Sequence, residues 1–150
     1  MKIMFICTGN TCRSAMGQAL MKKRVKELNK DIEVYSCGIY AAAGESSTNH
    51  AIQVMRNYGV DLSSHRAIDI HKSDIKEMDL ILCATSSNEK SVLGLYPELK
   101  EKVYTIKEYS EYNPNGLDQD INDPYGGSME LYQKCAEELA ECIEMILKKL

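Results

Sequence analysis

A cysteine and an arginine stand six positions apart in the stretch CTGNTCRS, residues 7–14, which follows the apolar run MKIMFI. Every residue between them is small or polar. A loop between a strand and a helix turns the unpaired backbone N–H groups of the helix start into its concavity, where they attract an anion. Gly9 and Asn10 tolerate the left-handed backbone that such a nest needs, and the Arg13 guanidinium can grip two phosphate oxygens. The stretch therefore predicts a phosphate site.

The thiol of Cys7 lies at the entry to this predicted cradle. The dipoles and the arginine that attract phosphate also stabilise a thiolate, which is a nucleophile at neutral pH. We expect Ser14 to cap the helix and to offer its hydroxyl to the sulfur. Neither G-x-x-x-x-G-K nor G-x-G-x-x-G occurs here, which disfavours a nucleotide-binding loop. The alternative interpretation is that Cys7 only ends a buried strand and that Arg13 is a surface charge.

An acid is needed to protonate the leaving group when a thiolate attacks phosphorus, and a loop carboxyl is a usual donor. Residues 107–127, rich in Tyr, Asn, Asp, Gly and Pro, are predicted as one long loop, and such loops are more often functional than idle. They offer Asp118, Asp120 and Asp123. We select Asp123, because Pro124 restricts the backbone before it and lets the carboxyl be aimed. The alternative is that DPYGG is only a turn.

The rest of the chain alternates short β-prone runs with longer segments of helical period, which is typical of a parallel sheet covered by helices on both faces. Strands are predicted at residues 2–6, 33–37, 80–84 and 103–106. Helices are predicted at residues 14–29, 48–58, 73–78 and 88–95, and from about residue 128 onward. Ligands of such sheets bind beyond the carboxyl ends of the strands, where residues 7–14 lie.

Composition limits the class of protein. A chain of 150 residues that is 44% hydrophobic predicts a single domain over residues 1–150. Its 22 acidic against 18 basic side chains, with a net charge of -4, argue against nucleic acid or a membrane as partner. No run of apolar residues approaches a membrane span and the start lacks a cleavage signal, so we expect a cytoplasmic protein. Six scattered cysteines without a C-x-x-C pair indicate neither a disulfide framework nor zinc.

These residues resemble the low-molecular-weight protein tyrosine phosphatases, which carry C-x5-R-S near the N-terminus and D-P-aromatic before the last helix, as residues 7–14 and 123–125 do here. The resemblance runs the whole chain. It implies an α/β, flavodoxin-like fold of three layers with a four-stranded parallel sheet of order 2-1-3-4. Cys7 would form a cysteinyl phosphate, Asp123 would act as acid and then base, and Arg13 would hold the oxygens, without metal or cofactor. The implied partners are phosphorylated proteins, and we expect a monomer.

The resemblance also implies supporting roles. The substrate-binding residues would be Thr8, Gly9, Asn10, Thr11, Cys12, Ser14 and Tyr125, and the residues that support the loop from behind would be Asn10, Ser14, Ser36 and His65. Cys12 resembles the second loop cysteine of the family, which traps an oxidised nucleophile as a reversible disulfide, and a plain packing role is the alternative. Ala15 and Ile68 depart from the usual proline and arginine of the family, which leaves the helix entry and the loop after His65 open.

Thr11 bears on the substrate. Tyrosine-specific members have an apolar residue there, whereas CTGNTCRS resembles the loop of the bacterial protein-arginine phosphatases, which also share the threonine at Thr85. A threonine narrows the mouth and adds a polar edge, and Asp123 can hydrogen-bond a guanidinium. This favours phosphoarginine over phosphotyrosine, although Tyr40 and Tyr125 can equally wall a slot for a phosphotyrosine ring.

Two other functions use a similar loop. Thioredoxin-coupled arsenate reductases relay oxidation through two further cysteines, and Cys83 resembles the first of them. Lys90 stands where the second would be, which argues against that interpretation. A phosphate-binding module without turnover would lack a nucleophile or an acid, and this chain has candidates for both.

Overall fold

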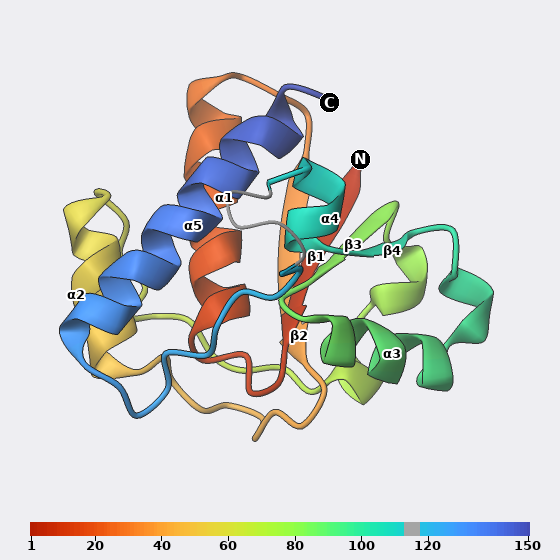
Figure 1. Ribbon diagram of the computed structural model, residues 1–150, viewed down its shortest axis with the longest axis horizontal. Helices are drawn as coiled ribbons and strands as arrows, with labels where there is room; N and C mark the ends of the chain where they lie inside the picture. Colours follow the sequence, from red (N-terminus) through yellow and green to blue (C-terminus); the bar gives the residue numbers. More distant parts are fainter. Residues whose placement is uncertain (113–117) are drawn as a thin grey trace.

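Four strands form one parallel sheet in the computed structural model, which describes residues 1–112 and 118–150. The strands are β1 (Lys2–Cys7), β2 (Glu33–Gly38), β3 (Leu80–Cys83) and β4 (Val103–Thr105). They pair in the order β2-β1-β3-β4 with every neighbouring pair parallel (Figure 1). The predicted sheet order is confirmed. Residues 113–117 of the predicted long loop lie outside the described residues.

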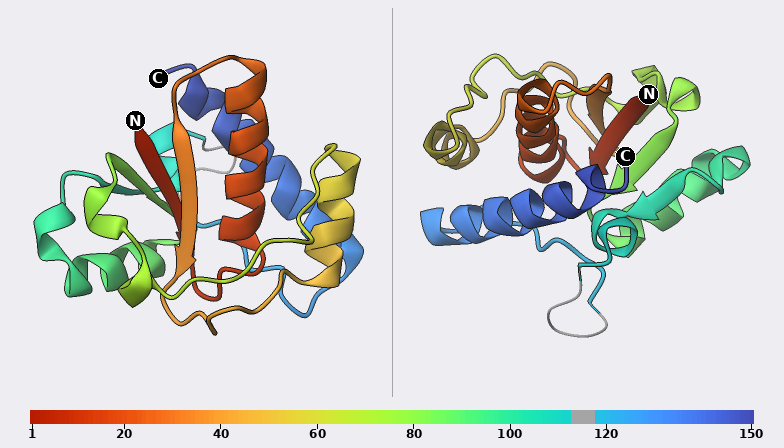
Figure 2. Two further views of the ribbon diagram at one scale, coloured as in Figure 1. Left: turned by 180° about the vertical axis from the view of Figure 1, so that it is seen from behind. Right: turned by 90° about the horizontal axis from the view of Figure 1, so that it is seen from above.

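Helices cover both faces of this sheet (Figure 2). One face is covered by α1 (Arg13–Glu27), α4 (Ile106–Ser110) and α5 (Met129–Leu147), with α2 (Asn49–Asn57) packed against α1 and α5. The other face is covered by α3 (Ser86–Leu95) and the short 3-10 turns Ile70–Lys72, Ile75–Glu77 and Pro97–Leu99. Each face of the sheet has its own hydrophobic core: the first core lies under α1, α4 and α5, and the second core lies under α3 and the 3-10 turns. Along β1, Ile3 and Phe5 pack into the first core and Met4 and Ile6 pack into the second core, because successive side chains of a strand point to opposite faces.

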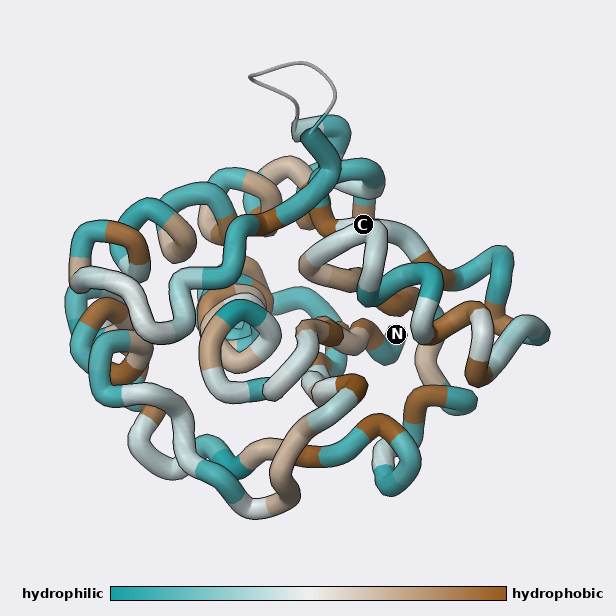
Figure 3. The backbone as a smooth tube through the Cα atoms, turned by 60° about the horizontal axis from the view of Figure 1, so that its bottom comes forward, coloured by the Kyte–Doolittle hydropathy of each residue, from teal (hydrophilic) through white to brown (hydrophobic). Residues whose placement is uncertain are grey.

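The last helix shows how the sequence pattern becomes packing. Ser128 caps α5, its hydroxyl accepting a hydrogen bond from the Leu131 backbone N–H at 3.4 Å. The apolar positions spaced three and four apart are buried, as predicted; they are Tyr132, Cys135, Ala136, Leu139, Cys142, Ile143, Ile146 and Leu147. Hydrophobic residues are interspersed with hydrophilic ones along the coloured part of the tube (Figure 3). Burying each large apolar side chain contributes about 1.5–3 kcal/mol to folding.

The predictions and the structure differ most informatively at three elements. The helix predicted at residues 73–78 is wrong, because the only helical residues there are the 3-10 turn Ile75–Glu77, which is separate from the preceding 3-10 turn Ile70–Lys72. The strand predicted at residues 103–106 ends at Thr105, whose hydroxyl accepts a hydrogen bond from the Glu108 N–H at 3.0 Å and so starts α4 inside the predicted loop. Helix α3 begins two residues earlier than predicted because Thr85 caps it in the same way through the Asn88 N–H.

Helix α4 carries a buried charge that its sequence does not mark as buried. Lys107 is only 5% exposed. Its Nζ lies 3.1 Å from the Glu138 Oε2 on α5 and 3.9 Å from the Asp118 Oδ2. A buried ammonium is tolerated only when it is paired, and these carboxylates come from distant parts of the chain.

Across residues 1–112 and 118–150, no helix is both long enough and apolar enough to span a membrane.

Candidate active site

The loop of residues 7–14 joins β1 to α1 at the carboxyl end of the sheet (Figure 1). Its backbone turns around the sulfur of Cys7: the Asn10 N–H donates to Sγ at 3.3 Å and the Ser14 N–H at 3.4 Å. Asn10 has φ of 56°, the left-handed conformation expected for this nest. N–H groups aimed at a sulfur are placed to stabilise negative charge that develops on it.

Ser14 has one of its two predicted roles. Its hydroxyl lies 2.9 Å from the Cys7 Sγ and accepts a hydrogen bond from the Asn10 side-chain amide at 2.8 Å. The predicted helix cap is wrong, because α1 begins at Arg13 after Cys12 and no side chain caps it. Ser14 already lies inside the first turn of α1, and its hydroxyl contacts the Cys7 Sγ and the Asn10 amide instead of a backbone N–H of the helix.

Arg13 is buried, with only 4% of the residue exposed. Its Nη1 donates to the Ile121 carbonyl at 3.0 Å, which fixes the guanidinium, and its Nη2 lies 3.6 Å from the Asp123 Oδ2. Its Nε is buried and has no hydrogen-bond partner among the residues that the structure describes. Buried polar groups are almost always satisfied, so the edge formed by Nε and Nη2 is suited to two oxygens of an anion.

The predicted catalytic side chains meet in one hollow of about 230 Å³. Its lining residues are Cys7, Thr8, Gly9, Thr11, Cys12, Arg13, Glu45, Asp123 and Tyr125. Of the predicted substrate-binding residues, Asn10 and Ser14 do not line it and lie behind the loop instead. Tyr125 is 67% exposed at its edge, and Tyr40, 80% exposed, does not line it.

Three aspartates competed for the role of acid, and the structure separates them. Asp123 lines the hollow, and its Oδ1 accepts a hydrogen bond from the Tyr125 N–H at 3.1 Å, which orients the carboxyl. Asp120 is bound to the start of α3 through the Ser86 N–H at 2.8 Å. Asp118 faces the buried Lys107 described above. Asp123 is therefore the aspartate whose carboxyl reaches the hollow.

Behind the loop, the side chain of Asn10 is completely buried and fully used. Its amide nitrogen donates to the Ser14 hydroxyl and, at 3.0 Å, to the Ser36 hydroxyl on β2, while its Oδ1 accepts the Ile68 N–H at 2.9 Å. His65 Nε2 lies 2.7 Å from the Asn10 carbonyl oxygen. Burial lowers the pKa of His65, so the neutral ring meets this carbonyl with its Nε2–H as the donor. The four residues predicted to support the loop lie together in this network.

The second loop cysteine has a different environment from the first. The Cys12 Sγ lies 3.3 Å from the Tyr132 hydroxyl and 3.7 Å from the Thr48 hydroxyl. Burial raises the pKa of the Cys12 thiol. Both Cys7 and Cys12 are free thiols, and a disulfide between them remains a prediction.

Cys83, the residue on which the arsenate reductase interpretation depends, lies in β3 with no exposed surface. Burial raises the pKa of its thiol well above the ordinary value. A relay cysteine has to be reached by a partner thiol, and this one is enclosed by the second core.

Two residues of the site escaped sequence reasoning. Glu45 reaches the hollow from the segment between β2 and α2, where nothing in the sequence marks it. Gly38 ends β2 so close to the loop that a Cβ there would lie 2.7 Å from the Thr8 carbonyl oxygen and 2.9 Å from the Asn10 nitrogen. Gly38 could have been found from the sequence, because a glycine at the end of a strand often marks a close approach of another backbone segment.

Comparison with known proteins shows matches along the whole chain. Residues 2–150 match the family model described as low molecular weight phosphotyrosine protein phosphatase. The protein-arginine-phosphatase of Geobacillus stearothermophilus is 36% identical over 149 residues, which are 99% of this chain and 95% of that protein. The crystal structure of a low molecular weight protein tyrosine phosphatase from T. tengcongensis has a TM-score of 0.92 and 40% identity, covering 100% of this chain and 99% of that one.

A third match carries information on a reaction. It is a cysteine-to-serine mutant of the YwlE arginine phosphatase with a phosphorylated active site serine, with a TM-score of 0.91 and 30% identity over 100% of this chain and 95% of that one. The family resemblance seen in the two sequence motifs is confirmed by these matches.

Proposed function

We propose that this chain, which belongs to the low molecular weight phosphotyrosine protein phosphatase family, removes phosphate from protein side chains through a phosphorylated Cys7. One observation carries the proposal: a sulfur that accepts hydrogen bonds from two backbone N–H groups, a buried guanidinium whose Nε has no partner among the described residues, and an exposed carboxyl share one small hollow. The YwlE mutant that carries phosphate on a serine in place of its cysteine supports the same route. We place the reaction in the cytoplasm, because a nucleophilic thiolate has to stay reduced.

The first step transfers the phosphoryl group to sulfur. The Cys7 thiolate attacks phosphorus, an S–P bond forms, and the bond from phosphorus to the leaving nitrogen or oxygen breaks. The Asp123 carboxylic acid gives its proton to the leaving atom. The three other phosphate oxygens carry the charge of the transition state, and the Nε and Nη2 groups of Arg13 and the loop amides bind them.

The second step releases phosphate. Asp123, now a carboxylate, takes a proton from a water molecule whose oxygen attacks phosphorus. The S–P bond breaks, inorganic phosphate leaves, and Cys7 returns as the thiolate that the Asn10 and Ser14 amides stabilise. The same carboxyl serves both steps because it lies beside the hollow at 52% exposure, where both a leaving group and water can reach it.

Phosphoarginine is the substrate that the mouth of the hollow favours. Glu45 and Asp123 place two carboxyl groups, whose oxygens can accept hydrogen bonds, in the lining of this hollow of about 230 Å³. A guanidinium is a cation with several donors, whereas a phenol ring is neutral. Thr11, 7% exposed, adds a hydroxyl to the lining. A Cβ added at Gly9 would lie 3.7 Å from the Thr11 Oγ1, so the Thr11 hydroxyl lies close to the loop backbone at Gly9.

Replacing Thr11 with isoleucine is expected to shift the preference. The ratio of kcat/KM for a phosphoarginine peptide to that for a phosphotyrosine peptide of the same sequence should fall by roughly tenfold or more, because the polar edge is exchanged for an apolar one. Parallel steady-state assays of phosphate release on the two peptides measure this ratio.

The matched control is Thr8→Ile, the same change on the same loop. The Thr8 side chain is turned toward the Asn88 amide at 3.4 Å, so the ratio should change less. Equal ratios in the wild type and in Thr11→Ile would show that Thr11 does not set the substrate preference. A wild-type preference for the phosphotyrosine peptide would show that phosphoarginine is not the preferred substrate, and the proposed two-step reaction would still stand.

Gly38 provides a test of how closely the loop has to be positioned. In Gly38→Ala the new Cβ meets two backbone atoms of the loop, so the loop has to move, and kcat/KM for p-nitrophenyl phosphate should fall by roughly 10²-fold. Gly94→Ala is the control, since a Cβ there meets no atom within 4 Å. Its kcat/KM should equal that of the wild type. Normal kinetics in Gly38→Ala would show that the loop tolerates displacement.

A further inference from the structure

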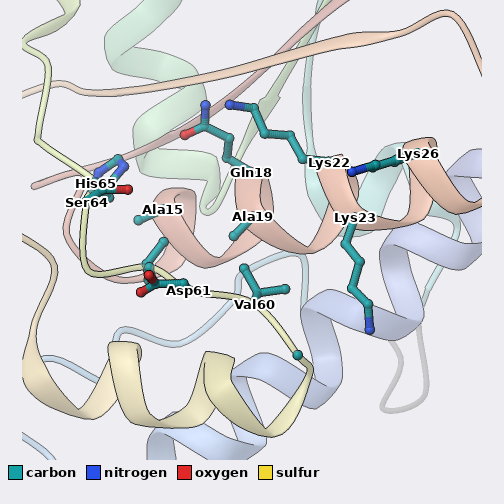
Figure 4. A pocket seen from close by; sticks show the side chains of 12 residues that line it. Ala15, Gln18, Ala19, Lys22, Lys23, Lys26, Val60, Asp61, Ser64 and His65 are labelled. Carbon is teal, nitrogen blue, oxygen red and sulfur yellow. The ribbon is translucent and has the colours of Figure 1, made fainter.

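A second hollow lies between α1 and the segment of residues 59–65, and none of the residues that line the active-site hollow lines it. Its volume is about 520 Å³, larger than the active-site hollow and within the range of small-molecule sites. Figure 4 shows its two walls: Ala15, Ala19 and three lysines come from α1, and Val60, Asp61 and His65 come from the segment after α2.

Positive charge dominates this second hollow. Lys22, Lys23 and Lys26 all line it, and the Lys23 ammonium donates to the Tyr58 carbonyl oxygen at 2.5 Å, which leaves the exposed Lys22 and Lys26 at the opening. Asp61 is the carboxylate among the lining residues, and its Oδ1 already accepts the N–H and hydroxyl of Ser63. In a chain with a net charge of -4, such a local surplus of lysine is suited to an anion.

The wall between the charges is apolar. Ala15 and Ala19 on α1 lie opposite Val60 (Figure 4), and their side chains are small. Leu62 of the same segment as Val60 also lines the hollow. A fully hydrated inorganic ion gains nothing from such a wall, whereas an organic anion buries its body there while its charged group stays with the lysines.

His65 connects this hollow to the nucleophile. Its ring lines the hollow, and its Nε2 lies 2.7 Å from the Asn10 carbonyl oxygen, while the N–H of Asn10 donates to the Cys7 sulfur. The charges acting on His65 are those of Lys22 on α1 and Arg66 beside it, and both lower its pKa together with burial. An anion beside Lys22 offsets part of that positive field and so raises the pKa of His65. A higher pKa favours the protonated ring, which is a stronger donor to the Asn10 carbonyl than the neutral ring.

We propose that this hollow binds a small organic anion with an apolar body, and that its occupancy raises the affinity of the active-site loop for phosphate through His65. The inference concerns anion binding and does not depend on which phosphorylated side chain is the substrate.

Site-resolved NMR of the ¹⁵N-labelled chain tests binding with 2-naphthalenesulfonate as the probe. We expect saturable shifts of the amides of residues 59–65. Two control compounds each keep one part of the probe: methanesulfonate keeps the sulfonate, and 2-naphthol keeps the naphthalene ring. Each should bind at least about tenfold more weakly than the probe, because one loses the contact with the apolar wall and the other loses the charge that the lysines attract.

Lysine variants separate this site from the active site, which also attracts oxyanions. Lys22→Gln/Lys26→Gln should weaken the probe at residues 59–65 by at least about tenfold, since two charges that face it are removed. Lys90→Gln/Lys100→Gln makes the same change in charge on the α3 side of the sheet and should leave the affinity unchanged. Shifts confined to residues 7–14, or equal affinity in both double variants, would overturn the site.

Reciprocity tests the coupling. With the probe saturating, the dissociation constant of inorganic phosphate, followed by the amides of residues 9–14, should fall by about fivefold or more, and phosphate should tighten the probe by the same factor. In His65→Gln, which keeps a donor for the Asn10 carbonyl but has no titrating ring, the factor should approach one. Probe binding without any change in phosphate affinity would overturn the coupling. Competition between probe and phosphate would also overturn it.

Discussion

The Cys7→Ser variant is expected to hydrolyse p-nitrophenyl phosphate at least about 10⁴-fold more slowly than the wild type, which corresponds to about 5 kcal/mol of lost transition-state stabilisation. The Asn10 and Ser14 amides and the Ser14 hydroxyl around the Cys7 Sγ stabilise an existing anion, and no group among the described contacts of Cys7 is a base. A serine hydroxyl therefore stays neutral in this loop and attacks poorly.

Phosphate binding shows whether the Cys7→Ser variant is intact. Arg13 and the loop amides remain, so inorganic phosphate should still bind, as measured by calorimetry. Cys142→Ser is the matched control, because that thiol lies in the core beneath α5 and contacts none of the hollow. Its kcat should be unchanged, with at most a loss of stability. A Cys7→Ser rate within tenfold of the wild type would point to direct attack by water, and a wild type without steady turnover would favour a phosphate-binding module.

The Asp123→Asn variant is expected to lose about 10²- to 10⁴-fold in kcat on a phosphoarginine peptide or on phenyl phosphate. An amide cannot give a proton to the leaving atom or take one from water. On p-nitrophenyl phosphate the rate of the first step, phosphoryl transfer to Cys7, should fall by a smaller factor, because p-nitrophenolate leaves without a proton. Rapid-mixing assays on the three substrates measure this dependence on the leaving group.

Asp118→Asn provides the matched control for this change. It removes the same charge from the same segment, but that carboxyl faces Lys107 and is absent from the hollow. Its kcat should stay near that of the wild type on all three substrates. If Asp123→Asn lost the same factor on phenyl and p-nitrophenyl phosphates, Asp123 would not be the proton donor. A larger loss in Asp118→Asn would move the role to that residue.

Local chemistry was readable from the sequence because it is contained in short stretches. The nest around Cys7 needs only a strand end, residues of tolerant backbone and a helix start, all within residues 7–14. The strands and long helices were readable for the same reason, since a period of two or of 3.6 residues is a property of a few turns of chain. The sheet order followed from the family resemblance rather than from any pattern in these residues.

Elements shorter than two turns were lost because they have no period to detect. Helix α4 spans Ile106–Ser110 and depends on the Thr105 cap and on the pairing of Lys107 with Glu138, which is 31 positions away and unmarked in the sequence. The 3-10 turn Ile75–Glu77, which lies where a helix over residues 73–78 was predicted, is shorter still. For such segments the tertiary environment decides the backbone.

The sequence by itself determined which atoms are available for chemistry at this site: a thiol in a nest, a guanidinium and a carboxyl before a proline. The tertiary structure alone decided where they meet, through the Arg13 bond to the Ile121 carbonyl, the Asn10 amide between Ser14 and Ser36, and the approach of Glu45 to the mouth. The physical reason is that these contacts join groups from separate elements, whose relative positions are fixed only when the two cores on either side of the sheet are packed.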